Sequence, residues 1–297
     1  MAVFLLGLAG ACCLGLGFVL QQRAAMRAPL ADFLSFRLLL DLARMPDWLL
    51  GLALGAIGQV LAAIALGYGE VSLVEPLTAT NLLFALALSR WLTRQPLGWS
   101  GWGGVALLAA GVTAFIVAGR PRGGGNEAGA LRHWLVFGIV AGLAVLLVIK
   151  SRRLQPGGKA ALLALAAGLL YGLQDALTRV CGEIIGDDGV ADLFSHWQPY
   201  AVAVIGLTGI LLVQSAFEMA PLRNSLPSLT AAQPLAGIAC GVGFLGDRLR
   251  VTPGALAWAA VGLAAIVFGV VLLGRHPAMP SGITQHKPKV GATRSDR

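Results

Sequence analysis

The sequence carries very little charge for its length. Only 12% of its 297 residues are Asp, Glu, Lys or Arg, whereas 57% are hydrophobic. A soluble domain carries about 25% charged residues, so this composition excludes an ordinary soluble domain and predicts a polytopic membrane protein in contact with a lipid bilayer. The net charge of +8 is then typical of basic loops beside a membrane, and we expect no nucleic-acid partner.

Residues suited to chemistry are also scarce. The four Cys residues stand in or beside apolar stretches without C-x-x-C or Cys/His spacing, which predicts packing rather than a disulfide or a metal site. No group of His, acidic and Cys residues offers acid-base or nucleophilic chemistry, which disfavours an enzyme that acts on lipid. The glycine-rich stretch Arg120 to Gly125 lacks the Gly-Lys-Ser/Thr of a phosphate loop. We expect neither enzymatic activity nor a cofactor.

What the sequence has in quantity is long apolar runs. A helix needs about 20 such residues to cross a bilayer. We predict an all-α protein with about nine transmembrane helices, at residues 2–20, 48–68, 71–92, 97–118, 133–149, 159–185, 197–217, 225–246 and 253–274. The charged stretch 29–45 predicts an interfacial amphipathic helix, with a short tilted span as the alternative.

The distribution of basic residues predicts the orientation in the membrane. With nine spans and the N-terminus outside, 16 of the 22 Lys and Arg residues fall on the cytoplasmic side, including those of the tail at 276–297. The positive-inside rule therefore predicts a cytoplasmic C-terminus in a plasma membrane. We expect the basic tail to be disordered. The preference for Arg over Lys, with abundant Ala and Gly, favours a bacterial source.

The chain also contains an internal duplication. Gly15 and Gln21 recur as Gly168 and Gln174 at an offset of 153 residues, and Gly51 recurs as Gly206 at 155. At an offset of 158, the residues Pro76-Leu77, Arg90, Gly104 and Gly111 recur as Pro234-Leu235, Arg248, Gly262 and Gly269. We predict two four-helix repeats, at 1–118 and 159–275, with a connector and one linker helix between them at 119–158. A single linker helix inverts the second repeat, and in such proteins the binding sites lie between the repeats.

An acid beside a proline marks the third predicted span. Glu75 directly precedes Pro76, and an acid within the bilayer costs at least about 2.5 kcal/mol, so such acids usually face a bundle interior or a wet cavity. Pro76 breaks the helix hydrogen bonding and frees a carbonyl group, and Pro234 repeats this feature after Gln233. Glu75 is therefore a candidate ligand for a cation, a proton or an amine. The alternative is that it pairs with a polar group of another helix.

Further polar residues lie within the predicted spans. Asp175 and Arg179 are four residues apart on one helix face, which predicts an ion pair that either neutralises both charges or acts as a gate. Uncharged candidates for a substrate-binding cavity or for helix-helix contacts are Gln59, Asn81, Gln174, Gln214 and Gln233. Glu218 falls at a span end, where we expect it to be solvated. Close helix packing is predicted at the Gly-x3-Gly pairs 51/55, 138/142, 168/172 and 237/241.

Several of these residues together resemble a known family. Gly58-Gln59, Glu75-Pro76-Leu77, the Leu-rich run to Arg90, Trp99-x-Gly101 and Gly111 resemble the drug/metabolite transporter superfamily, as does the segment Gln214 to Gly237. Within it the chain looks most similar to the EamA-like and NIPA-type magnesium transporter branch, over about residues 1–275. Two departures matter. Gln59 stands where the NIPA-type second span has an acid, and the first span lacks the essential acid of small multidrug exporters.

The resemblance implies a secondary transporter that moves a small solute by alternating access between inverted repeats. An alternative within the same fold is a divalent cation path with Glu75 as the metal ligand, because magnesium keeps several waters and needs few carboxylates. A further alternative is a sensor or assembly protein of the membrane that transports nothing. The expected partners are lipid and a small-molecule or cation substrate, and a homodimer is left open.

Overall fold

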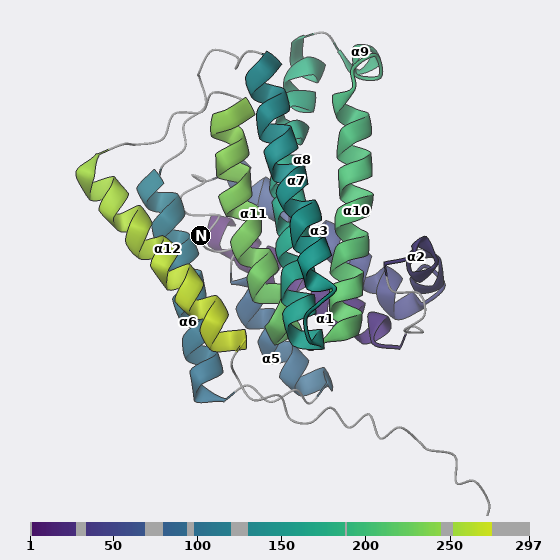
Figure 1. The fold of residues 1–297 in the computed structure, drawn as a ribbon, viewed down its shortest axis with the longest axis vertical. Coiled ribbons are helices and arrows are strands. Elements are labelled where there is room, and N and C mark those ends of the chain that lie inside the picture. The colour runs from purple at the N-terminus through teal and green to yellow at the C-terminus, as the bar shows by residue number, and fades with distance from the viewer. Residues whose placement is uncertain are drawn as a thin grey trace, which may run out of the picture.

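The computed structural model describes residues 2–27, 34–68, 80–93, 98–119, 130–187, 189–244 and 252–274. Every regular element in these ranges is a helix, which confirms the predicted all-α class. The helices are α1 (Ala2–Ala25), α2 (Phe36–Leu42), α3 (Pro46–Tyr68), α5 (Asn81–Thr93), α6 (Trp99–Gly119), α7 (Ala130–Ser151), α8 (Pro156–Asp187), α9 (Val190–Leu193), α10 (Gln198–Met219), α11 (Leu222–Phe244) and α12 (Pro253–Gly274) (Figure 1).

Six of the described helices are long and apolar enough to cross a membrane, namely α1, α6, α7, α8, α10 and α12. The count rises to seven if α2 and α3, which meet at an angle of 94°, form one bent span. This pattern is that of a multi-pass membrane protein. The number nine stays a prediction, because residues 69–79 of the third predicted span lie outside the described ranges and α11 is too polar to be among the six.

The first helix is longer than predicted. The sequence predicts its end at Leu20, before a polar flank, but α1 continues to Ala25. The reason is that Gln21 and Gln22 are buried, with 8% and 0% of their surface exposed, so the helix carries them into a protein interface rather than into water.

The charged stretch 29–45 contains the short helix α2. Ser35 caps its N-terminus, where the Ser35 hydroxyl accepts a hydrogen bond from the Arg37 backbone N–H at 3.3 Å. Leu38 and Leu42 are fully buried, whereas Phe36 is 59% exposed. This two-sided burial agrees with the predicted amphipathic helix, which meets α3 at an angle of 94°.

Glycine residues bring helices into backbone contact, both within the first half and between the two halves. A Cβ at Gly17 of α1 would lie 2.7 Å from the Gly51 carbonyl oxygen of α3. A Cβ at Gly111 of α6 would lie 2.8 Å from the Gly262 carbonyl oxygen of α12, and the reverse distance is also 2.8 Å. No side chain fits at these crossings, which hold α1 against α3 and α6 against α12 (Figure 1).

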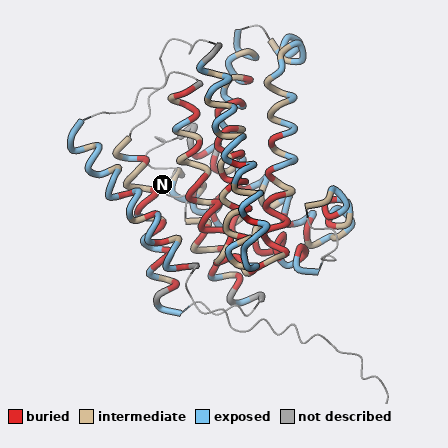
Figure 2. Tube along the Cα trace, in the orientation of Figure 1, coloured by how far each residue is buried: buried red, intermediate tan, exposed pale blue. Residues whose placement is uncertain are grey.

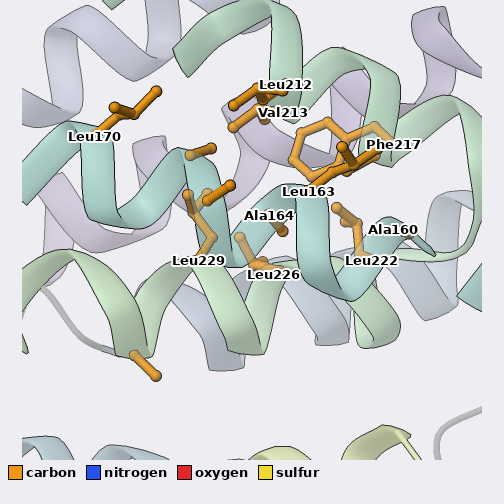
Figure 3. Packing of buried hydrophobic residues seen from close by; sticks show 14 of the residues in the cluster. Ala160, Leu163, Ala164, Leu170, Leu212, Val213, Phe217, Leu222, Leu226 and Leu229 are labelled. Carbon is orange, nitrogen blue, oxygen red and sulfur yellow. The ribbon is translucent and has the colours of Figure 1, made fainter. Parts of the chain in front are cut away.

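The most buried part of the molecule lies where α8 packs against α10 and α11 (Figure 2). Leu163 of α8, Phe217 of α10 and Leu226 of α11 meet there, and all three are fully buried (Figure 3). Gly168 and Gly172 of α8 contact the backbone of α11, so the predicted close packing at this pair is confirmed.

The predicted packing at Gly138 and Gly142 is wrong. Nothing among the described residues lies within 4 Å of the position of a Cβ at either glycine, and both residues are exposed. The reason is the position of α7. Both glycines lie on the side of α7 that faces away from the bundle, where no other described helix packs.

The α6–α12 crossing yields a stability prediction. We expect Gly111→Ala to lower the free energy of unfolding by about 1–3 kcal/mol, because the new methyl group overpacks against the α12 backbone. The matched control is Gly103→Ala in the same helix, where a Cβ meets nothing within 4 Å. Thermal unfolding in detergent measures both. Equal melting temperatures for the two variants contradict the tight crossing.

Candidate functional site: a polar seam between the halves

Buried amide side chains connect α1 in the first half of the chain with α10 in the second. The Gln214 side-chain N–H donates to Gln21 Oε1 at 2.7 Å, and Gln21 Nε2 donates in turn to the Gly51 carbonyl oxygen of α3 at 3.3 Å. Gln214 is 1% exposed and Gln21 8%. Gln21 therefore joins three helices, two from the first half and one from the second.

The next residue of α1 makes a second contact of this kind. Gln22 Nε2 donates to the carbonyl oxygen of Ala220, which links α10 to α11, at 3.0 Å. Phe18 and Phe217 pack edge to face beside these bonds, with ring centroids 6.2 Å apart. We call the set Gln21, Gln22, Gln214 and the Ala220 carbonyl the polar seam. It holds α1 against the end of α10.

Charged residues are buried close to the seam in sequence and structure. Glu218 follows Gln214 by one turn on the same face of α10, and both of its carboxylate oxygens are buried. Arg223, at the start of α11, is 5% exposed and Glu218 is 8% exposed. The expectation that Glu218 is solvated at a span end is therefore wrong, because α10 reaches Met219 and packs on α1 there. Charges inside a membrane protein are costly and usually functional.

One acceptor in the polar seam is unused. Gln214 Oε1 is buried and has no hydrogen-bond partner among the described residues. A buried acceptor without a donor costs about 1–3 kcal/mol. The seam thus has spare capacity to accept a hydrogen bond from a solute or a water molecule.

A second polar contact lies between α8 and α11. Gln233 Nε2 donates to Asp175 Oδ2 at 3.0 Å, and Asp175 is exposed. Pro234, inside α11, has no N–H to donate to the Thr230 carbonyl one turn earlier. The helix α11 continues through Pro234, so the predicted helix break there is wrong and the proline costs one backbone hydrogen bond. The structure brings together a carboxylate and an amide that lie 58 residues apart in the sequence.

The remaining predicted residues lie elsewhere. Glu75 and Pro76 fall outside the described residues. Gln59 is exposed on α3, away from the polar seam. Asn81 is the first residue of α5, and its Oδ1 is buried without a partner among the described residues. The expected pair of Asp175 with Arg179 stays a prediction, and the contact that the structure shows for Asp175 is with Gln233.

Gln174 takes a position that matches Gln21. A Cβ at Gly206 of α10 would lie 3.1 Å from Gln174 Nε2, just as a Cβ at Gly51 of α3 would lie 3.0 Å from the Gln21 side chain. Gln174 thus packs on a glycine of a neighbouring helix, rather than standing alone in a cavity.

Sequence reasoning missed Gln21, Gln22 and Arg223 as site residues. Gln21 served only as a marker of the duplication, because the first span was expected to end before it. A signal was present in Gln214 and Glu218, which stand four residues apart inside the apolar run of α10. Two polar residues on one face of a spanning helix indicate contact with another polar surface.

The described residues offer no cluster of three or more His, Cys, Asp or Glu side chains that is arranged to hold a metal ion.

The sequence is similar to known proteins over almost the whole length of the chain. The sequence is 29% identical over 287 residues to an uncharacterised protein of Corynebacterium glutamicum, which covers 94% of this chain and 96% of the relative. It is 23% identical over 291 residues to the probable magnesium transporter NIPA9 of Arabidopsis thaliana, which covers 92% of this chain and 81% of the relative. No family model and no solved structure matches.

The polar seam yields a test by double-mutant cycle. We expect Gln21→Leu and Gln214→Leu each to destabilise the protein, and the double variant to be more stable than the two single losses imply, because each single change orphans a buried amide. The expected coupling is about 0.5–1.5 kcal/mol in thermal or denaturant unfolding. A cycle between Gln174→Leu and Gln214→Leu is the control. Additive effects in both cycles contradict the Gln21–Gln214 hydrogen bond.

Proposed function

We propose that the protein is a secondary membrane transporter that moves a small solute by alternating access between two inverted halves. The polar seam is the observation that carries this proposal. It joins α1 of the first half to α10 of the second with buried, partly unsatisfied amides, and transporters of this architecture bind their substrates between the repeats. The similarity to a probable magnesium transporter over 92% of the chain supports the same class of function.

Matching contacts in the two halves support the inverted repeat. The duplication relates Gln21 to Gln174 and Gly51 to Gly206. Gln21 packs on Gly51 in the first half and Gln174 packs on Gly206 in the second. Two residue pairs that recur in the sequence therefore recur as two contacts. This correspondence supports the predicted repeat.

The α6–α12 crossing supports a twofold relation between the halves. The offset of 158 relates Gly104 to Gly262 and Gly111 to Gly269. In the structure Gly104 contacts Gly269, and Gly262 contacts Gly111. Exchanging the two halves turns one contact into the other, which is the property of an interface built around a twofold axis. An inverted repeat has such an axis in the membrane plane.

A divalent cation such as magnesium is the second candidate substrate. The similarity to NIPA9 favours it. The lack of a three-residue metal cluster among the described side chains does not weigh against it, because magnesium keeps most of its waters and is held by one or two carboxylates. Glu75 is the carboxylate that the sequence offers for this role.

The transport proposal is tested in proteoliposomes. We expect saturable flux of at least one solute from a panel of metabolites, drugs and Mg²⁺, with and without a pH gradient. Gln214→Leu should lower the transport rate at least fivefold, because it removes the seam amide. Thr208→Val is the matched control, since Thr208 is exposed on α10 and its hydroxyl donates to the Val204 carbonyl of the same helix. Folded protein that moves neither the solutes nor Mg²⁺ contradicts transport and favours a sensor or assembly role.

A carboxylate variant separates the two candidate substrates. If the protein conducts Mg²⁺, Glu75→Gln should abolish the flux, because the amide loses the charge that holds the cation. A transporter of neutral solutes should tolerate the change. Fluorescence of a magnesium indicator inside liposomes measures this, with Glu183→Gln, an exposed acid near the end of α8, as the control.

A further inference from the structure

Asp175 points from α8 toward α11. Gly168 and Gly172, which contact the α11 backbone, lie seven and three residues before it, so all three share one helix face. The hydrogen bond to Gln233 of α11 fixes this direction. Asp175 is nevertheless exposed. Its carboxylate therefore lies at the edge of the α8–α11 contact, where part of it is exposed.

The duplication assigns a counterpart to Asp175. The offset of 153 that relates Gln21 to Gln174 also relates Gln22 to Asp175. Gln22 is fully buried and bound to the Ala220 carbonyl, whereas Asp175 is exposed. Equivalent positions of the two halves are thus closed in one half and open in the other.

The two positions lie at different depths of the molecule. Gln22 contacts Ala220, just before α11 begins, and Asp175 contacts Gln233, thirteen residues later. At 1.5 Å per residue this is a separation of about 20 Å along α11, two thirds of a bilayer core. The buried contact and the exposed one therefore lie at different depths along α11.

We propose that Asp175 and Gln233 form the recognition site for a positively charged solute, a metal cation or a protonated amine, at the open end of the transport route. This rests on the proposed function and adds the substrate charge and the residues that select it. Gln22 is the closed counterpart at the other end and carries no charge.

The chemistry of the site favours a cation. A carboxylate has about four acceptor positions, and Gln233 uses one of them. The Gln233 side-chain oxygen and the Thr230 carbonyl, which Pro234 leaves without its helical donor, are further oxygens on α11. Two further residues lie near the Asp175 carboxylate. Arg179 follows it by one turn of α8 and is exposed. Cys240 of α11 is buried. An anion would meet the Asp175 carboxylate first, and a neutral solute would gain little from its charge.

Cysteine accessibility tests the open and closed ends without any substrate. In a variant whose four native cysteines are replaced, we expect Asp175→Cys to react quickly with a membrane-impermeant maleimide applied to one face. Gln22→Cys should stay protected from either face. Comparable labelling of the two positions, or labelling only of Gln22→Cys, overturns the assignment of the open end.

Binding tests the charge of the solute. The probes are Mg²⁺ for a metal cation and tetraphenylphosphonium for an organic cation, with uncharged glucose as the reference. We expect at least one of the two cations to raise the melting temperature of the wild-type protein in detergent, and glucose to leave it unchanged. Asp175→Asn should weaken this binding at least tenfold, and Asp175→Glu should retain most of it. The control is Glu183→Gln, which removes a charge from the same helix outside the site.

The two proposals fail in different ways. If the wild type transports solutes but Asp175→Asn binds and transports a cation as the wild type does, the recognition site is wrong and the transporter stands. If cations stabilise the wild type through Asp175 but nothing is transported, the site stands and the transporter is wrong.

A Gln233→Leu variant tests the second residue of the site. It supports the pair if it raises the KM or the Kd by a smaller factor than Asp175→Asn. An unchanged value assigns recognition to Asp175 without Gln233.

Discussion

The arrangement of this protein depends on the close approach of helix backbones at glycine. Between helices in a bilayer, burial of apolar side chains gains little over contact with lipid tails, so van der Waals packing and hydrogen bonds must hold the bundle together. Gly17 against Gly51, and Gly111 against Gly262, let two helices touch through their main chains. The first of these crossings also places Gln21 beside the Gly51 carbonyl, where it bonds. The glycines at the α1–α3 crossing therefore set the position of the polar seam.

Polar groups serve a second purpose in this bundle. Gln21, Gln22 and Gln214 hold two halves of the chain together through bonds that exchange readily for bonds to water or solute. In the structure, one buried acceptor of this interface, Gln214 Oε1, receives no hydrogen bond from a described residue. A transporter needs two arrangements of similar free energy, and an interface with an unused acceptor is easier to open than a fully bonded one. In the proposed transporter, the side chains that stabilise the bundle are therefore also those whose hydrogen bonds must open.

Much of the fold follows from the sequence. The apolar runs predict the helices to within a few residues, and the Gly-x3-Gly pairs at 51/55 and 168/172 lie at real crossings. The failures have a common cause. Gly138 and Gly142 form the same motif in a helix with no described neighbour on that side, while Glu218 was expected to be solvated and is buried. A local pattern reports what a helix can contact, and the neighbour that it meets depends on distant parts of the chain.

The sequence by itself determined that the chain is helical and membrane-embedded, because the length and the apolarity of each run act locally and a bilayer allows few structures. It also marked the recurring residues of the two halves. Only the tertiary structure decided which polar groups meet. Gln21 finds Gln214 across 193 residues, and Gln233 rather than a neighbour on α8 donates to Asp175. The physical reason is that such a bond requires a particular rotation and depth of both helices, and these are set by their packing against the rest of the bundle.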